Sequence, residues 1–468
     1  MQNLTSFIFN SKRILKDREP SGELPSDETL LRRTLKVAWP SMLESFLIAL
    51  VSLVDTIMVS SLGDYAIAAV GLCGQPKMLG LAVFLALSTA VSALVARRKG
   101  EGDRQSAVRI LKLALCVTVV LAVAVCCAAF FFADDILTLM GAQADTKEYA
   151  VEYFRIVMGG LGFNILSMII NAAQRGSGNT KIAMRTNLTS NLVNICFNYL
   201  LINGHFGFPA LGVRGAAIAT VIGTVVACVM SFLSVLHPDG YIYLLLKTDG
   251  IYDKRSVDSL LNIGSSSFLE QLFLRVGFLV YAALVGHLGT TAYTTHQIAM
   301  NILTISFAFG DGLSVAAVAL VGFSLGEKRP DLAQIYGSFC QRCGLICSLV
   351  LSIIYVFFGK YIFSVFSNTP QVISDGTIIM QLMTVIVLIQ ISQVIYSGCL
   401  RGSGDAKYTA LVSFLNIALL RPALAYLMIY VLDFGLIGAW IGLAIDQTVR
   451  LVMTSVRFKR GKWMKIEI

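Results

Sequence analysis

The stretch SMLESFLIALVSLVDTIMVSSLGDYAIAAV, residues 41–70, determines how the rest of the chain is organised. It is apolar enough to enter a bilayer, yet it carries two carboxylates, Glu44 and Asp55. Because an α-helix turns about every 3.6 residues, a spacing of eleven places both side chains on one face, about three turns apart. The sequence therefore predicts a membrane helix with an acidic face.

The same pattern returns at an offset of 226 positions, in SFLEQLFLRVGFLVYAALVGHLGTTAYTTH, residues 267–296. There Glu270 takes the position of Glu44, and the same offset joins RGSGNTK (residues 175–181) to RGSGDAK (residues 401–407). One constant offset over such a length indicates a direct duplication. Each copy begins with a membrane helix that carries an acid.

The composition indicates a polytopic membrane protein. Of the 468 residues, 56% are hydrophobic and 14% are charged, against about 25% charged residues in a soluble domain. Such a chain has too few polar residues to cover a surface in water. We attribute the net charge of +9 to basic residues at helix ends and expect no nucleic-acid partner. The ten cysteines lie almost entirely in apolar runs, so neither disulfides nor a metal site is expected.

Twelve apolar segments follow the amino-terminal tail, each long enough to span about 30 Å of hydrocarbon. They lie near residues 34–60, 66–96, 107–133, 149–173, 182–203, 211–236, 258–287, 291–323, 333–359, 375–399, 408–431 and 435–457. Six segments per copy is an even number, so both copies enter the membrane from the same side. The predicted fold class is an all-α polytopic membrane protein with twelve transmembrane helices in two six-helix bundles, related by a parallel repeat.

The segments and their polar connections divide the chain into five parts. We expect a cytoplasmic tail (1–32), an N-lobe with transmembrane helices 1–6 (33–236), a cytoplasmic linker (237–256), a C-lobe with helices 7–12 (257–459) and a cytoplasmic carboxyl-terminal tail (460–468). Basic residues gather in one set of connections and in both tails, which the positive-inside rule places in the cytoplasm. The amino-terminal tail lacks the apolar core of a secretory signal and is expected to be flexible. The predicted location is the plasma or inner membrane.

Ionisable side chains inside the segments are the first candidate functional residues, because each costs free energy in a bilayer unless it faces water or a partner. Asp55 has no basic residue near it in sequence, so it is the leading candidate for coupling a cation to transport. Glu44 and Glu270 are further candidates for the same role. Desolvation disfavours an unpaired charge, which suits a carboxyl group that carries a proton. Glu44 and Lys77 lie at similar depth and could pair, so Glu44 is open between transport and structure.

Four asparagines on the fifth segment form a stripe along one helix face. Such a stripe indicates contact with protein or water rather than with lipid. Interhelical hydrogen bonding is one interpretation, and a polar cavity wall near Asp55 is the other. The candidate substrate cavity collects this stripe and further polar residues of the segments: Asn187, Asn191, Asn194, Asn198, Asn164, Gln390, Arg275, His296, Asp311 and Arg421. Asp446 and Arg450, one turn apart on the last segment, are expected to pair with each other.

The chain carries no motif of an enzyme. Its four histidines form no HExxH motif, and the glycine-rich GSGNTK and GSGDAK lack the spacing of a phosphate-binding loop. No cofactor is therefore expected, and neither is transport driven by ATP binding to this chain.

These features together resemble the MATE family, the multidrug and toxic compound extrusion transporters. The resemblance runs from about residue 33 to 460 and rests on the duplication and on a series of short motifs: VDTIMVSSLG (54–63), RGSGNTK, RGSGDAK, THQIAMNI (295–302), LVGFSLGE (320–327) and an Arg-Pro pair in the eleventh segment. It implies two bundles around a central cleft and a secondary active transporter rather than an enzyme. The implied partners are the lipid bilayer and small organic, often cationic and lipophilic, compounds. We expect the chain to function as a monomer.

The resemblance also implies export in exchange for inward H⁺ or Na⁺, with Asp55 in cation coupling and with Asp55 as the candidate Na⁺ site. One branch of the family has a second acid on the fifth helix, where Asn198 stands here. Another branch pairs a seventh-helix Glu, one turn beyond Glu270, with a tenth-helix Asp that has no match here. The resemblance leaves open whether the coupling ion is H⁺ or Na⁺ and which lobe binds it. The alternative function is a flippase or exporter of lipid-linked or polar metabolites with the same superfamily architecture.

Overall fold

The computed structural model describes residues 8–15, 19–140, 144–248, 250, 253–367 and 369–466. Every regular element in these ranges is a helix, which confirms the predicted all-α class. In chain order the elements are α2 (Ser11–Leu15), α3 (Asp27–Ser60), α4 (Asp64–Gly100), α5 (Arg104–Phe131), α6 (Ala133–Leu139), α7 (Ala144–Gly176), α8 (Thr180–Ile202), η1 (His205–Gly207), α9 (Val213–Leu236), α10 (Lys254–Gly286), α11 (Thr290–Gly326), α12 (Pro330–Phe366), α13 (Pro370–Gly402), α14 (Ala406–Ser413), η2 (Phe414–Leu420), α15 (Arg421–Tyr426), η3 (Leu427–Val431), α16 (Gly435–Arg460) and η4 (Lys462–Lys465).

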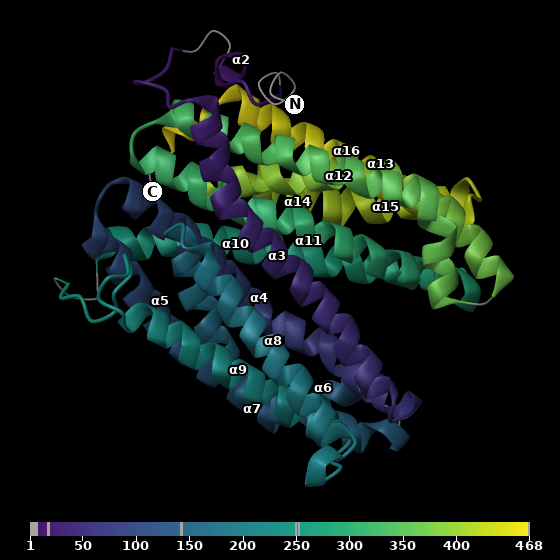
Figure 1. Cartoon of the computed structure of the whole chain (residues 1–468). Coiled ribbons are helices and arrows are strands. Elements are labelled where there is room, and N and C mark those ends of the chain that lie inside the picture. The colour runs from purple at the N-terminus through teal and green to yellow at the C-terminus, as the bar shows by residue number, and fades with distance from the viewer. Residues whose placement is uncertain are drawn as a thin grey trace. The chain divides into compact units, whose positions relative to one another are not determined.

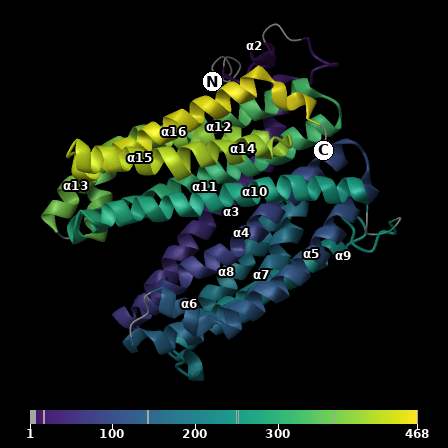
Figure 2. The same ribbon diagram turned by 180° about the vertical axis from the view of Figure 1, so that it is seen from behind.

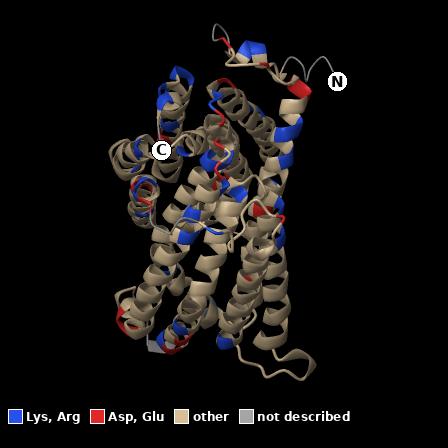
Figure 3. Ribbon diagram, turned by 90° about the vertical axis from the view of Figure 1, so that its left-hand side faces the viewer, with Lys and Arg blue, Asp and Glu red and all other residues tan. Residues whose placement is uncertain are grey.

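All twelve predicted segments coincide with helices. In the described chain, 11 helical stretches are long and apolar enough to cross a membrane. The remaining segment is α8, whose 23 residues suffice in length but include the four asparagines that lower its hydropathy. Figure 3 shows that most of the length of the long helices is free of charged side chains. The predicted polytopic fold is therefore confirmed, with α8 as its most polar span.

The chain divides into two compact units. The N-unit comprises Phe46–Lys99 and Asp103–Gly264, and the C-unit comprises Met1–Ser45, Gly100–Gly102 and Ser265–Ile468. The boundaries fall inside α3, at the last residue of α4 and inside α10. The division into lobes, tails and a linker expected from the sequence stays a prediction.

The two units repeat one packing pattern. In the N-unit α7 packs on α5 and α9, and α8 packs on α9; in the C-unit α13 packs on α12 and α16, and α15 packs on α16 (Figures 1 and 2). Helices α5, α7 and α8 begin at positions 104, 144 and 180, and α12, α13 and α14 begin at positions 330, 370 and 406, at the same offset of 226 in each case. The duplication seen in the sequence is thus a duplication of the fold.

The first glycine of each RGSG motif allows two helices to approach closely. A Cβ atom on Gly176 would lie 2.4 Å from the backbone oxygen of Ser92, and one on Gly402 would lie 2.6 Å from that of Val318. Gly402 and Val318 lie 226 positions after Gly176 and Ser92, so the same helix crossing is present in both copies of the repeat. Two residues after Gly176, Gly178 has a φ of +80°, in the left-handed region that favours glycine.

We expect Gly176→Ala to lower the free energy of unfolding by about 1–3 kcal/mol, because the added methyl group overpacks a backbone contact. Gly159→Ala is the matched control on the same helix, since a Cβ there meets nothing within 4 Å. Alanine at that position is neutral or stabilises by up to about 1 kcal/mol, because it favours the helix. Thermal unfolding in detergent compares the two variants, and equal stability would contradict the packing role of Gly176.

Residues 8–15, the described part of the predicted amino-terminal tail before residue 19, pack against α12. Phe9 and Ile14 are buried, and the ring of Phe9 meets Phe339 of α12 edge to face, with 5.2 Å between the ring centroids. Arg342 of α12 donates a hydrogen bond to the backbone oxygen of Ile8. The prediction weighed only the charges of the tail, whereas its few apolar residues pack against the C-unit.

Candidate functional site

A cavity of about 290 Å³ lies inside the N-unit. Five helices contribute a polar side chain to its wall: Asp55 from α3, Lys77 from α4, Tyr153 from α7, Asn198 from α8 and Thr220 from α9. The predicted coupling residue therefore faces a cavity within one unit rather than lipid.

The carboxylate of Asp55 is held by amides of α8. Asn198 donates from Nδ2 to Oδ1 of Asp55 at 2.9 Å. Asn194, one turn earlier, donates from its amide nitrogen to both carboxylate oxygens, at 2.8 and 3.2 Å, in the orientation in which its amide oxygen accepts from the backbone N–H of Thr220. Hydrogen bonds to a charged acceptor are stronger than those between neutral groups, so α8 fixes the position of this carboxylate.

Lys77 is a basic neighbour of Asp55 that its position in the sequence does not reveal. It lines the same cavity as Asp55 and acts on that carboxylate electrostatically. Lys77 and Asp55 belong to different helices, so no helix-face rule brings them together. The pairing of Lys77 with Glu44, which the sequence left open, stays a prediction. The cavity thus holds an acid and a base whose charges cancel when both are ionised.

The asparagine stripe of α8 divides into two parts. Asn194 and Asn198 are buried, with exposed fractions of 7% and 2%, and both reach Asp55. Asn187 and Asn191 lie one to two turns earlier and are not fully buried: each is half-buried, as is Asn164 on α7. The role of these three side chains in a substrate cavity stays a prediction.

Sequence reasoning missed Tyr153 and Thr220. Tyr153 lies among charged residues near the start of its segment, and Thr220 is a small uncharged residue in a largely apolar run. The duplication carried a signal for one of them. The residue 226 positions after Thr220 is Asp446, a buried acid that the sequence did single out. Comparing the two copies position by position would therefore have placed Thr220 at a polar site.

The positions of the C-unit that correspond to this cavity carry different chemistry. The residues 226 positions after Asp55, Val70 and Thr220, which all line the cavity of the N-unit, are Tyr281, His296 and Asp446. The ring centroid of His296 lies 5.4 Å from that of Tyr281 and 5.7 Å from that of Trp440, and all three rings are buried. Two positions that line the cavity of the N-unit thus carry packed rings in the C-unit.

An ion pair lies next to these rings. Arg421 donates to Oδ2 of Asp446 from Nε at 3.0 Å and from Nη2 at 2.6 Å, and the two side chains have exposed fractions of 1% and 0%. Arg421 begins the short α15 between the π-helical η2 and η3, and Pro422 follows it. Proline removes a backbone N–H and crowds the preceding turn, which accounts for the irregular helix here. Asp446 makes its close ion pair with Arg421 on another helix rather than with Arg450, which one turn away on α16 interacts with that carboxylate electrostatically.

Glu270 belongs to a second polar cluster of the C-unit. It accepts from the hydroxyl of Thr409 at 2.9 Å, and its carboxylate lies 3.8 Å from the guanidinium group of Arg401. Arg401 also donates to Ser314 at 3.1 Å. Arg450 interacts electrostatically most with Asp446 and Arg421, and then with Glu270 and Arg401, so it links this cluster to the ion pair. Three guanidinium groups and two carboxylates make the linked clusters more attractive to an anion than to a cation.

The remaining predicted residues are spread through the C-unit. Asp311 on α11 accepts from Ser45 on α3 at 3.5 Å. Glu44 on α3 and Gln390 on α13 are buried, and Arg275 on α10 is half-buried. Glu44 and Asp55 share one face of α3 but belong to different units. Among the described residues, no group of three or more His, Cys, Asp or Glu side chains is arranged to hold a metal ion.

Comparison with known proteins places this arrangement in a family. The family model MatE matches residues 40–200 and again residues 266–427, so the second match begins at the offset of the repeat from the first. The chain is 28% identical over 463 residues to the probable multidrug resistance protein NorM of Thermotoga maritima, covering 97% of this chain and 96% of that protein. It is 28% identical over 438 residues to the multidrug resistance protein MdtK of Yersinia pestis, covering 92% and 95%.

Solved structures share the fold. An outward-facing multidrug resistance MATE family transporter of the MOP superfamily matches with a TM-score of 0.86 and 22% identity, over 94% of this chain and 100% of that one. A MOP superfamily transporter from Pyrococcus furiosus, whose binding pocket is described as having reverse polarity, matches with a TM-score of 0.87 and 22% identity, over 95% and 100%. Because the family model matches most of the chain in two consecutive copies, the chain belongs to the MatE family and is a multi-pass membrane transporter, not an enzyme.

Proposed function

We propose that the chain is an H⁺-coupled antiporter that exports organic, cationic and lipophilic compounds by alternating access. The family and the name of multidrug resistance protein carried by NorM and MdtK support the export of drugs. The observation that carries the coupling is the carboxylate of Asp55, which faces a cavity of the N-unit together with an ammonium group and the amides of α8.

The donors around Asp55 favour H⁺ over Na⁺ as the coupling ion. Hard cations such as Na⁺ bind oxygen ligands, but Asn194 and Asn198 turn N–H groups toward the carboxylate, and Lys77 brings a positive charge into the same cavity. The N–H donors and the ammonium group both disfavour binding of Na⁺ at this carboxylate. A proton instead binds to the carboxylate itself and leaves Lys77 as an uncompensated charge, a change that favours a different packing of the surrounding helices.

The size of the cavity favours separate binding sites for the coupling ion and for the substrate. At about 290 Å³ it is just below the roughly 300–1,000 Å³ of pockets that hold drug-sized ligands. We therefore assign the proton to this cavity and the substrate to the polar side chains beyond it, first Asn187 and Asn191 on the same face of α8. Inward proton movement supplies about 2.3 kcal/mol per charge per 100 mV, in addition to the pH gradient.

The N-unit is the proposed site of coupling because the C-unit counterpart lacks a comparable acid. Tyr281 stands at the position of Asp55, and the nearby acid, Asp446, is paired with Arg421 at 2.6 Å with no exposed surface. Exchanging a proton at Asp446 would require breaking a buried ion pair, which is costly. Glu270 has two cationic neighbours and is likewise less suited to bind a further cation.

The proposed location is the plasma or inner membrane, with both termini in the cytoplasm. Basic residues at the ends of α4 and α16 support this orientation, because positive charge is retained on the cytoplasmic side. The proposed working unit is a monomer.

The test uses purified protein in proteoliposomes, with efflux of the lipophilic cation ethidium as the signal. Acidifying the compartment into which ethidium moves is expected to drive its efflux, whereas a Na⁺ gradient of the same direction at constant pH is expected to have no effect. Efflux driven by Na⁺ alone would contradict proton coupling. The absence of efflux of any organic cation under both gradients would contradict antiport of this substrate class.

The cations of the C-unit favour a second candidate, export or flipping of an anionic lipid-linked or polar metabolite. Arg401 and Arg450 stand beside Glu270, and one structural neighbour is described by the reverse polarity of its binding pocket. The same proteoliposomes, loaded with a fluorescent anionic phospholipid and quenched from outside, distinguish the two functions. Protein-dependent exposure of the lipid in the outer leaflet, without ethidium efflux, would favour the second candidate.

A further inference from the structure

One buried guanidinium group of the C-unit has no acid of its own. Arg450 on α16 has an exposed fraction of 8%. Of the two carboxylates that act on it, that of Asp446 pairs with Arg421 at 2.6 Å, and that of Glu270 lies 3.8 Å from Arg401. Three guanidinium groups therefore stand against two carboxylates, and the proposed antiport mechanism does not use the extra charge.

Each of the three guanidinium groups also keeps an N–H group without an acceptor. The described residues offer no hydrogen-bond partner to Nε of Arg401, Nη1 of Arg421 or Nε of Arg450, and all three atoms are buried. One carboxylate oxygen, Oδ1 of Asp446, is in the same position. Buried donors without acceptors are rare in folded proteins, because each costs free energy. Three such donors and one such acceptor indicate a ligand that accepts hydrogen bonds.

The extra charge determines the class of that ligand. A water molecule could accept hydrogen bonds from these N–H groups, but it would leave the positive charge of Arg450 without compensation. A buried charge without a partner is costly in the interior of a membrane protein. An anion offsets both the charge and the unmatched donors, since charge-assisted hydrogen bonds are the stronger ones.

The burial of the cluster limits the size of the anion. With Arg450 only 8% exposed, the open space next to its side chain is small. Arg401 lies in the last turn of α13, and its side chain is 17% exposed, so the cluster is not sealed there. A single halide ion suits such a place, whereas organic compounds occupy pockets of roughly 300–1,000 Å³.

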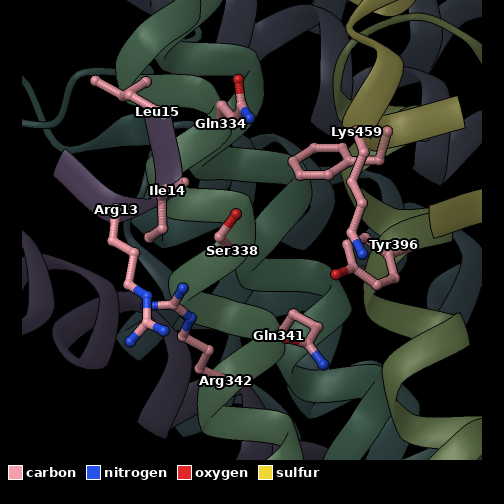
Figure 4. Close-up of a pocket in the computed structure, with 10 residues that line it drawn as sticks. Arg13, Ile14, Leu15, Gln334, Ser338, Gln341, Arg342, Tyr396 and Lys459 are labelled. Carbon is pink, nitrogen blue, oxygen red and sulfur yellow. The ribbon is translucent and has the colours of Figure 1, made fainter. Parts of the chain in front are cut away.

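A larger cavity of the C-unit suits an anion less well. This cavity of about 600 Å³ is lined by residues of α2, α12, α13 and α16 (Figure 4). Two of its donors are already engaged, because Gln341 donates to Ser392 and Arg342 donates to the backbone oxygen of Ile8. Arg450 differs from them in that its Nε is buried without an acceptor.

We propose that a resident halide ion, chloride under physiological conditions, binds within the C-unit at Arg450 and compensates its charge. Arg401 and Arg421 supply further N–H donors to the same cluster. The inference goes beyond both functions proposed above, because this ion stays with the protein and is neither the coupling ion nor the exported compound.

The test measures thermal unfolding of the full chain in uncharged detergent, while sodium chloride replaces sodium gluconate at constant ionic strength. A ligand that binds the folded protein raises the unfolding midpoint in a saturable manner, and gluconate is too large for the site. Arg450→Met removes the charge and the donors but keeps an unbranched side chain. The control Arg460→Met makes the same change on the same helix at an exposed residue.

We expect chloride to raise the midpoints of the wild type and of Arg460→Met with the same half-saturating concentration, and bromide to act in the same way. Arg450→Met should show no saturable response. Arg450→Lys keeps the charge but not the planar set of donors, so it should need at least about tenfold more chloride, as charged hydrogen bonds contribute that much each.

The two salts also separate a bound ion from a structural role of Arg450. In gluconate, Arg450→Met should be at least as stable as the wild type, because the variant keeps both carboxylates with their partners and loses only the extra cation. An equal loss of stability in gluconate and in chloride would overturn the proposal. So would a wild type whose midpoint does not depend on the anion, a measurement that needs no variant. Neither result bears on coupling at Asp55, because no transport is measured.

Discussion

Asp55→Asn is expected to reduce proton-driven efflux of ethidium to the rate of liposomes without protein. Asparagine keeps the size of aspartate and can still hydrogen bond to Asn198, but it cannot exchange a proton. The cavity of the N-unit would then hold Lys77 without its acid in every state of the cycle. Initial rates under an imposed pH gradient, at matched amounts of inserted protein, measure the effect.

Glu44→Gln is the matched control for this variant. It makes the same change from carboxyl to amide on the same helix, but Glu44 belongs to the C-unit and does not line the cavity of Asp55. We expect this control to keep proton-driven efflux. Full efflux by Asp55→Asn, or an equal loss in both variants, would contradict the assignment of coupling to the N-unit cavity.

Arg421→Met is expected to lower the free energy of unfolding by about 3–5 kcal/mol, because it leaves the carboxylate of Asp446 buried without its partner. The double variant R421M/D446L replaces the whole ion pair by apolar side chains and should recover most of that loss, since two desolvated charges are removed together. Thermal unfolding of the wild type and of both variants in detergent measures these changes. A double variant as unstable as the single one would contradict the loss of the ion pair of Asp446 as the cause of the instability.

The same double variant separates structure from transport. If the ion pair of Arg421 and Asp446 has only a structural role, R421M/D446L should export ethidium at close to the wild-type rate. Loss of efflux in a stably folded double variant would show instead that Arg421 takes part in a substrate cavity, the role that its position in an apolar segment predicted.

The fold could be predicted from the sequence because two strong signals agree. Apolar length identifies spans regardless of their partners, and the constant offset of the duplication fixes how the copies correspond. For that reason the starts of α12, α13 and α14 repeat those of α5, α7 and α8 at the same offset. The packing of residues 8–15 could not be predicted, because burial of Phe9 depends on a surface of α12 that local sequence does not reveal.

The contacts of the site could be predicted only in part. The stripe on α8 indicated a polar wall near Asp55, and Asn198 does donate to that carboxylate. Charge pairs were harder, since sequence spacing reveals only partners within one helix. Lys77 acts on Asp55 from another helix, and Asp446 pairs with Arg421 rather than with Arg450 one turn away. The rotation of neighbouring helices about their axes decides such pairs, and it follows from the packing of the whole unit.

The most direct test of coupling at Asp55 is proton release on substrate binding. Purified protein in weakly buffered detergent solution, with a pH indicator, is mixed with ethidium while binding is followed by fluorescence. We predict that the wild type releases protons as ethidium binds and that Asp55→Asn binds ethidium without releasing any. Equal proton release by the two proteins would contradict the role of this carboxyl group as the carrier of the coupling ion.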